Sequence, residues 1–277
     1  MTRSDIFTIR PSSLPSYNDC PRRTIAKAYP FLLRDAGYFP RELPSSVGAA
    51  VGSSVHKAGE HSLRIKMETG GNIGTDADAI DAAVAEFDER IEEGVIWDDT
   101  TPTRDAAQRQ IDVMSKMYRS RIVPKLTPIM IEGRIELKYK PGFLISGQPD
   151  VVEANGALKP SLRDTKTGVV RRANSAQYGD YIALLNSVHI EVGNAVEDFL
   201  QRVRVNAPQP EPESHSYDVK ACVALAKATN DRMIRDIQTF LETGDIETFA
   251  PNPMSMMCGD KYCPLHGTDA CPHHKKD

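Results

Sequence analysis

Residues 143–181 read FLISGQPDVVEANGALKPSLRDTKTGVVRRANSAQYGDY and decide the fold. Within this stretch, Asn155-Gly156 is the dipeptide most typical of a tight β-hairpin turn. The apolar residues before it and the alternating residues after it predict two antiparallel strands. A third element, with helical spacing, follows at the end of the stretch.

Three charged residues of this hairpin are expected to share one face. Side chains two positions apart on a strand point the same way, so Asp164 and Lys166 lie together. Asp150, on the partner strand, can reach the same face. Carboxylate oxygens bind hard divalent cations such as Mg²⁺. An ammonium group orients an attacking water or offsets transition-state charge. This combination suits hydrolysis of a phosphodiester.

Pro149-Asp150, followed by Asp164-Thr165-Lys166, resembles the signature of the PD-(D/E)xK nuclease superfamily. The resemblance implies an α/β fold of the restriction-endonuclease type, with a central mixed sheet flanked by helices. It also implies metal binding by the two aspartates and a catalytic lysine. A solvated hairpin with incidental charges is the alternative, because Asp and Lys are common surface residues.

A helix is predicted from about Ala176, with Ser175 as its cap. Gln177 and Tyr181 lie four positions apart and therefore share a face of this helix. Such a pair after the Asp-x-Lys strand resembles the RecB-type branch of the superfamily, in which it contacts the DNA backbone and supports the catalytic centre. An ordinary amphipathic helix with a polar edge is the alternative.

Residues 12–23 read SSLPSYNDCPRR. Their pattern resembles the N-terminal motif of RecB-type nucleases that carry an iron–sulfur cluster, with Cys20 as the first ligand. A small buried apolar side chain is the alternative reading of a lone cysteine.

Gly52-Ser-Ser-Val-His56 resembles the Gly-x-x-x-His motif of the same branch, in which the histidine is a metal ligand. Neutral imidazole binds Mn²⁺ well and Mg²⁺ less readily. Glu60 lies four positions after His56, so a helix would bring it near the same site. The alternative is a structural histidine.

The C-terminal segment MCGDKYCPLHGTDACPHH, residues 257–274, holds three of the five cysteines. Together with Cys20, the cysteines Cys258, Cys263 and Cys271 match the ligand count of a [4Fe–4S] cluster and resemble the frame found in AddB and in CRISPR-associated RecB-like exonucleases. The gap of four residues between the first two tail cysteines departs from the usual two. One alternative is a zinc site, with His266, His273 or His274 completing the ligand set. A second alternative is that the thiols bind no metal. Cys222 is expected to be buried and inert.

Composition and charge set the outer bounds. The 277 residues are 40% hydrophobic and 26% charged, typical of a soluble globular protein. No apolar run approaches the ~20 residues that span a bilayer, and the first residues lack the apolar core of a signal peptide. A cytoplasmic location, in a prokaryotic or phage-infected cell, is expected.

With a net charge of −4, binding of a nucleic acid requires a local basic stripe. The candidates are Arg163, Lys166, Arg171 and Arg172.

Apolar residues at helical spacing predict scaffold helices over residues 76–122, interrupted near Pro102. Residues 129–140 alternate like a strand, and the resemblance suggests that its Glu136 supports the metal; an exposed carboxylate is the alternative. One or two strands are expected in 188–205, a proline-rich linker in 205–216, and a long helix over 221–243 that ends at Gly244. We expect one nuclease domain over 1–277, comprising a helical region (1–125), a catalytic sheet core (126–205) and a C-terminal helix with the cysteine tail (206–277).

The resemblance implies a Mg²⁺- or Mn²⁺-dependent DNA exonuclease of recombination, repair or end processing. Asp150, Asp164, Lys166, Gln177 and Tyr181 would form its catalytic centre. Arg171 and Arg172 would hold the strand. Two alternatives remain: a CRISPR adaptation nuclease that trims spacers, and an inactive nuclease fold that binds DNA or assembles with other proteins. A homo-oligomer or a recombination or CRISPR protein is a further expected partner.

Overall fold

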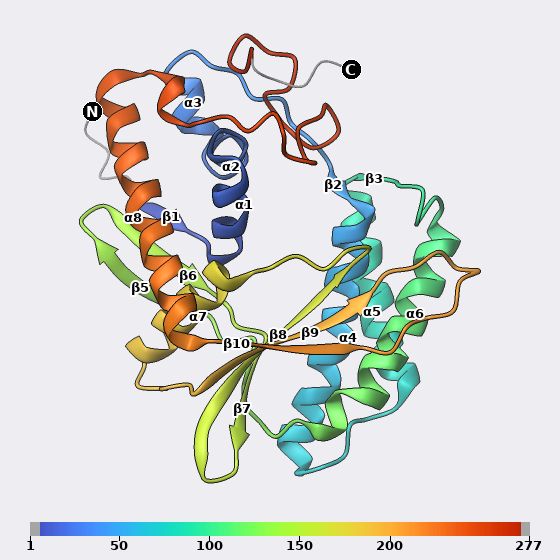
Figure 1. Cartoon of the computed structure of the whole chain (residues 1–277). Coiled ribbons are helices and arrows are strands. Elements are labelled where there is room, and N and C mark those ends of the chain that lie inside the picture. The colour runs from blue at the N-terminus through green and yellow to red at the C-terminus, as the bar shows by residue number, and fades with distance from the viewer. Residues whose placement is uncertain (1–5, 273–277) are drawn as a thin grey trace.

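A five-stranded mixed sheet occupies the centre of the computed structural model, which describes residues 6–272 (Figure 1). Its strand order is β10-β9-β8-β7-β4. The strands are β4 (Pro128–Ile131), β7 (Val151–Asn155), β8 (Leu158–Gly168), β9 (Asn194–Gln201) and β10 (Glu213–Tyr217). Only β8 and β9 are parallel, and the other neighbours are antiparallel. The predicted mixed α/β fold is therefore confirmed.

The hairpin predicted at Asn155-Gly156 joins β7 to β8. Asn155 pairs with Leu158, and Gly156 has a φ of +57°, a left-handed conformation that glycine adopts without steric cost. Beyond the turn, β8 continues far enough to pair with β9 from Ser161 to Gly168. In that parallel register Asp164 lies opposite Glu197.

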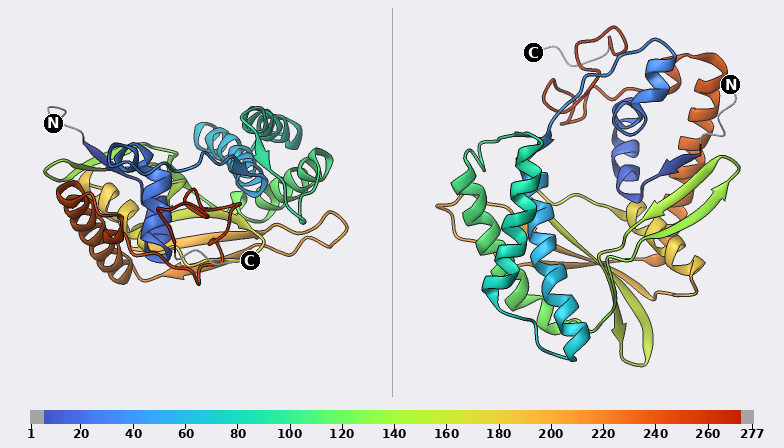
Figure 2. Two further views of the ribbon diagram at one scale, coloured as in Figure 1. Left: turned by 90° about the horizontal axis from the view of Figure 1, so that it is seen from above. Right: turned by 180° about the vertical axis from the view of Figure 1, so that it is seen from behind.

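Helices cover both faces of this sheet (Figure 2). The face that carries Val151 and Leu200 packs on α4 (Val47–Thr69), α5 (Asp76–Glu92) and α6 (Arg104–Arg121). The opposite face, with Val152 and Leu162, packs on α7 (Ser175–Ser187) and α8 (Val219–Thr243). The division follows from the two-residue period of strands, because neighbouring side chains point to opposite faces. The helices predicted within 76–122 and 221–243 are confirmed.

A second sheet, in the order β1-β6-β5, lies beside the first. Its strands are β1 (Phe7–Ile9), β5 (Ile135–Lys140) and β6 (Phe143–Gly147), and a two-stranded pair is formed by β2 (Ser45–Ser46) and β3 (Val95–Ile96). The N-terminal helical elements are η1 (Pro11–Ser13), α1 (Leu14–Asp19), α2 (Pro21–Ala28) and α3 (Pro30–Asp35). A short turn, η2 (Val123–Lys125), follows α6.

The structure corrects three local expectations. Residues 129–140 do not form one strand: the chain breaks after Ile131, so β4 and β5 belong to different sheets. Residues 188–205 supply one strand, β9, within the expectation, but the end of the stretch expected to be a proline-rich linker forms β10. Ser175 is the first helical residue rather than the cap. Asn174 holds the cap position without a capping bond, and its side-chain nitrogen donates to Arg172 O and to Glu197 Oε2.

The C-terminal tail returns to the N-terminal helices. Gly244, with a φ of +67°, ends α8 as predicted; the turn η3 (Ile246–Thr248) follows, and residues 249–272 form turns without helix or strand. Arg22, only 1% exposed, donates to the carbonyl oxygens of Ile246, Phe249 and Ala270. Within residues 6–272 no helix has the length and apolar character needed to cross a membrane.

Candidate active site

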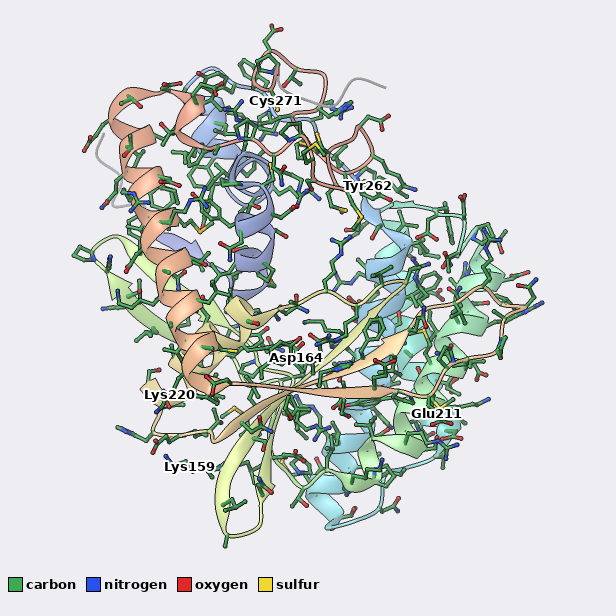
Figure 3. The ribbon with its side chains drawn as sticks, in the orientation of Figure 1. Lys159, Asp164, Glu211, Lys220, Tyr262 and Cys271 are labelled. Carbon is green, nitrogen blue, oxygen red and sulfur yellow. The ribbon has the colours of Figure 1, made fainter. Side chains whose placement is uncertain are left out.

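The hairpin brings Asp150, Asp164 and Lys166 together near the centre of the molecule, where Figure 3 labels Asp164. Lys166 Nζ lies 2.6 Å from Asp164 Oδ2. Asp150 immediately precedes β7, and its Oδ2 accepts a hydrogen bond of 2.8 Å from the backbone N–H of Thr165. The β8 backbone therefore orients one carboxylate, and its side chains supply the other carboxylate and the ammonium group.

Burial and charge set the protonation of this trio. Asp164 is 1% exposed. Burial raises its pKa to about 6, and the nearby charge of Asp150 adds to the rise, although Lys166 opposes it. Burial acts to lower the pKa of Lys166, but the negative charges of Asp164 and Asp150 hold that pKa above its ordinary value. The direction of this shift favours the ammonium form of Lys166 at neutral pH.

His56, on α4, faces the same centre. Its Nδ1 lies 3.2 Å from Asp150 Oδ2. This approach depends on Gly52, one helical turn earlier, because a Cβ there would lie 2.6 Å from Thr167 Oγ1 on β8. Glycine therefore lets α4 lie against the strand, which brings His56 to the carboxylates.

Glu132 also lies at this centre, although the sequence analysis did not predict it as a site residue. His56, Glu132 and Asp150 each offer one ligand atom, and these three atoms lie within 4.8 Å of one another. Glu132 follows the end of β4 and has a φ of +49°, unusual for a non-glycine residue. Gln148 Nε2 holds its carboxylate at 2.7 Å. The available signal was Gly133, which marks a turn where we expected a continuous strand.

The pKa of Glu132 is raised to about 8, first by burial and then by the negative charge of Asp150. Two crowded carboxylates of this kind are stabilised by a cation. Ligand atoms of octahedral Mg²⁺ are about 3 to 4 Å apart, given bonds of about 2.1 Å. The spacing and the oxygen and imidazole donors thus fit Mg²⁺ or Mn²⁺.

Two other acidic residues of the sequence analysis have different partners. Glu136 lies on β5 in the smaller sheet, where it accepts a hydrogen bond of 3.1 Å from Ser146 Oγ. Glu60 borders the same groove as His56, but it is paired with Lys57 and Arg64 at 2.9 and 2.8 Å. Although partial burial acts against it, these donors hold the pKa of Glu60 below its ordinary value.

Gln177 and Tyr181 share a face of α7, as predicted, and both are buried. Gln177 Nε2 lies 3.1 Å from Tyr181 OH and 3.4 Å from Asp164 Oδ1. The structure thus places the pair behind Asp164, where it helps to hold the carboxylate.

The basic stripe expected from the sequence divides into paired and exposed members. Arg163 points away from Lys166, because it lies one position from Asp164 on the strand, and it pairs with Asp198 and Glu153. Arg171 Nε donates to Glu197 at 2.7 Å. Arg172 is exposed and borders the groove, with Met257 Sδ 3.7 Å from its guanidinium.

A groove of about 1070 Å³ opens onto this centre. His56, Glu132, Asp150 and Lys166 line it, as does the segment 166–170 after β8. The cysteine tail supplies another wall through Met256, Met257 and Tyr262; Figure 3 labels Tyr262 beside the groove. Part of the tail therefore borders the groove onto which the candidate catalytic residues open.

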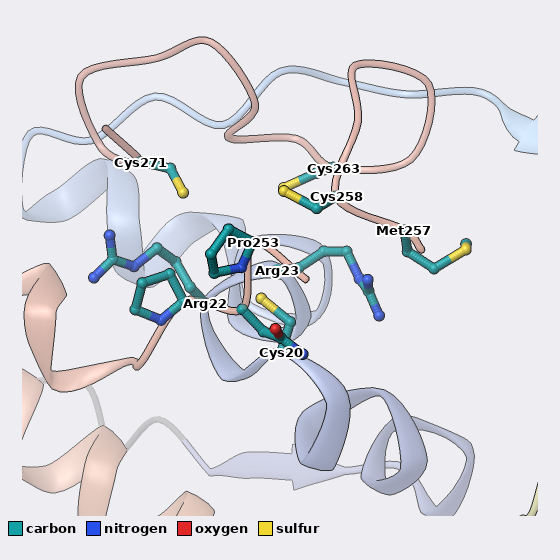
Figure 4. Close-up of a pocket in the computed structure, with 10 residues that line it drawn as sticks. Cys20, Arg22, Arg23, Pro253, Met257, Cys258, Cys263 and Cys271 are labelled. Carbon is teal, nitrogen blue, oxygen red and sulfur yellow. The ribbon is translucent and has the colours of Figure 1, made fainter. Parts of the chain in front are cut away.

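Cys20, Cys258, Cys263 and Cys271 line one small pocket between α2 and the tail (Figure 4). All but Cys258 are buried, and burial raises the pKa of the thiols of Cys263 and Cys271. Chain ends more than two hundred residues apart thus contribute to one thiol pocket, as the sequence analysis anticipated.

The structure also describes Cys222 and one of the three histidines proposed as zinc ligands. Cys222 is 1% exposed on α8, and burial raises the pKa of its thiol to about 11, so it is buried as expected and stays largely protonated at neutral pH. His273 and His274, proposed as zinc ligands, lie outside the described residues. His266 does not line the thiol pocket.

Comparisons with known proteins identify the class. A sequence model of the PD-(D/E)XK nuclease superfamily matches residues 8–272, and the chain belongs to this superfamily. A metal-dependent hydrolase with a nucleic-acid substrate is the activity consistent with this membership and with the His56, Glu132 and Asp150 group. No curated protein matches the sequence.

Among solved structures, the chain is similar in fold to a protein from Eubacterium rectale named "Putative exonuclease". The TM-score is 0.51 and the identity 10%, over 84% of this chain and 82% of that chain. The structure of SSO0001 aligns with a TM-score of 0.26 and 13% identity over 72% of this chain and 83% of that chain, too distant to support an argument.

Proposed function

We propose that the chain is a Mg²⁺- or Mn²⁺-dependent DNA exonuclease. The observation that carries this proposal is the convergence of His56, Glu132 and Asp150 on one point beside the Asp164–Lys166 pair. A pure binding module has no use for this combination. The similarity in fold to a protein named as an exonuclease supports attack at DNA ends.

The residues take distinct roles in this proposal. His56, Asp150 and Glu132, with Asp164 at their side, would hold the cation, which supplies charge neutralisation and an activated water. The Lys166 ammonium donates to the oxygens on which charge develops. Gln177 and Tyr181 keep Asp164 in place, and Arg172 contacts a phosphate of the strand in the groove.

We also propose that the four cysteines of the thiol pocket, Cys20, Cys258, Cys263 and Cys271, hold an iron–sulfur cluster. Among residues 6–272, the only group of three ligand atoms within 4.8 Å of one another is the one at His56, so the thiols are spread more widely. A single tetrahedral zinc with bonds of about 2.3 Å draws its thiolates to about 3.8 Å apart. Wider spacing favours a larger cluster, which would tie both ends of the chain together.

The direct test is an assay with end-labelled single- and double-stranded DNA. Purified protein should shorten the DNA from its ends with Mn²⁺ or Mg²⁺, and EDTA should stop the reaction. Circular DNA is the matched control, because an exonuclease leaves it intact. An absence of cleavage with either cation would overturn the proposal, and cleavage of the circle would replace the exonuclease by an endonuclease. Spacer trimming, a cytoplasmic location and a protein partner stay predictions from the sequence.

A further inference from the structure

Glu197, on β9, is a buried carboxylate that gathers donors from three parts of the fold. It is 0% exposed. Tyr178 of α7 donates to its Oε2 at 2.5 Å, and Tyr217 of β10 lies 3.2 Å from the same atom. Two residues of the segment that joins β8 to α7 complete the set, Arg171 at 2.7 Å and Asn174 at 3.0 Å. Four donors on one carboxylate make a rigid junction.

This junction lies next to Asp164, on the neighbouring strand. Glu197 lies opposite Asp164 in the parallel register of β8 and β9. Tyr178 stands between the two carboxylates: its hydroxyl donates its one proton to Glu197 Oε2 at 2.5 Å, and the hydroxyl oxygen lies 3.4 Å from Asp164 Oδ2. The Tyr178 ring is fully buried and packs against Tyr217 with centroids 4.9 Å apart. Glu197 and the packing of the ring thus hold the hydroxyl at this distance from Asp164.

The same junction fixes the wall of the groove. The Arg171 guanidinium donates hydrogen bonds to Glu197 at 2.7 Å and to Tyr217 OH at 2.6 Å. Its neighbour Arg172 remains in the groove lining. Arg171 is directed to Glu197 and Tyr217 and does not line the groove, whereas its neighbour Arg172 lines the groove and can meet a DNA phosphate there.

We propose that Glu197 is a positioning residue that aligns Asp164 through Tyr178 and anchors the groove wall through Arg171. Arg171 then serves the chemical step rather than DNA binding, and Arg172 is the phosphate ligand. The inference rests on the proposed nuclease activity, and it revises the role that the sequence suggested for Arg171.

The experiment compares kcat and KM for DNA cleavage with Mn²⁺. Glu197→Gln and Tyr178→Phe should each lower kcat by about 10- to 100-fold, the usual cost of removing a group that orients a ligand. The KM of both variants should stay within about twofold. Because Tyr178→Phe removes one atom, it carries the test if Glu197→Gln fails to fold.

Salt dependence separates the two arginines. Arg172→Ala should raise KM and reduce the slope of log affinity against log salt by about one, as expected for one lost phosphate contact. Arg171→Ala should lower kcat and leave that slope unchanged. An equal loss of slope in Arg171→Ala would contradict the assignment of Arg171 to Glu197.

Asp198→Asn is the matched control, because Asp198 is the next residue on β9, is equally buried, and pairs with Arg163 on the other face of the sheet. Both Asp198→Asn and Glu197→Gln remove a buried charge from β9, so both should lower the melting temperature. Only Glu197→Gln should lower kcat. Wild-type kcat in folded Tyr178→Phe or Glu197→Gln would overturn the positioning role. If the wild-type protein cleaves no DNA, the proposed function fails instead.

Discussion

Gly52 lies so close to Thr167 that a methyl group at position 52 would come within 2.6 Å of Thr167 Oγ1. The contact joins α4 to β8, the helix that carries His56 to the strand that carries Asp164 and Lys166. The glycine of the Gly-x-x-x-His pattern is thus explained by packing: it sets the distance between the imidazole and the carboxylates.

Gly52→Ala should push α4 away from β8 and move His56 from Asp150. We expect weaker Mn²⁺ binding by calorimetry and a loss of kcat of about 100-fold, as a displacement near 1 Å produces. Gly71→Ala is the control, because a Cβ at position 71 meets nothing within 4 Å. Full activity in Gly52→Ala would show that the strand yields without disturbing the site.

The hairpin and its charged face were predictable because both depend on local rules. Asn155-Gly156 specifies the turn, and the two-residue period then places Asp164 and Lys166 on one face. The same rule places Arg163 on the other face, so Arg163 does not belong to the basic stripe beside Lys166. Its ion pair with Asp198 depends on β9, which is far along the chain.

Contacts between distant segments were beyond the reach of sequence pattern. Glu132 enters the site only because the chain turns after β4, and this turn separates it from Glu136. The partners of Glu197 come from α7, β10 and a loop, so no spacing in the sequence signals them. The Arg22 contacts to the tail likewise span more than two hundred residues.

His56→Ala and Glu132→Gln should each weaken Mn²⁺ binding, because the first removes the imidazole ligand and the second removes the negative charge of a carboxylate ligand. Calorimetry should report a loss of about 10-fold or more in affinity. Glu136→Gln, which changes a carboxylate outside that group, should bind Mn²⁺ as the wild type does. Unchanged binding in His56→Ala would make that histidine structural.

Asp180 gives a pH-dependent stability that does not involve the active site. It is 1% exposed between α7 and α8, and burial raises its pKa to about 7, although Asn230 donates to it at 2.6 Å. Its Oδ2 and Asn230 Oδ1 have no hydrogen-bond partner among the described residues. A proton on Asp180 allows the carboxyl to donate within this pair.

The raised pKa fixes the sign of the effect. The unfolded chain releases this proton near pH 4 and the folded chain near pH 7, so the contribution is complete below pH 4 and lost by about pH 7. We expect Asp180→Asn to gain stability relative to the wild type as pH rises from 4 to 7, by on the order of 4 kcal/mol. Denaturant unfolding across this range measures the difference. Parallel stability curves would show that folding does not raise the pKa of Asp180.

Protein purified without oxygen should be brown and contain iron and sulfide if the thiol pocket holds a cluster. Cys20→Ser, Cys258→Ser, Cys263→Ser or Cys271→Ser should bleach and destabilise it, and Cys222→Ser should not. Arg22 and Arg41 also bind tail carbonyls, so we expect the bleached protein to stay folded with a lower melting temperature. A colourless protein with one zinc would overturn the cluster.

The most direct measurement of the catalytic account is the cleavage rate of Lys166→Ala on end-labelled DNA with Mn²⁺. Lys57→Ala is the control, because it removes a charge from the same groove without touching Asp164. Lys166 donates to transition-state charge more than to ground-state binding. Lys166→Ala should therefore abolish cleavage while binding DNA within a few-fold of the wild type, and Lys57→Ala should still cleave. Wild-type-like cleavage by Lys166→Ala would contradict the account.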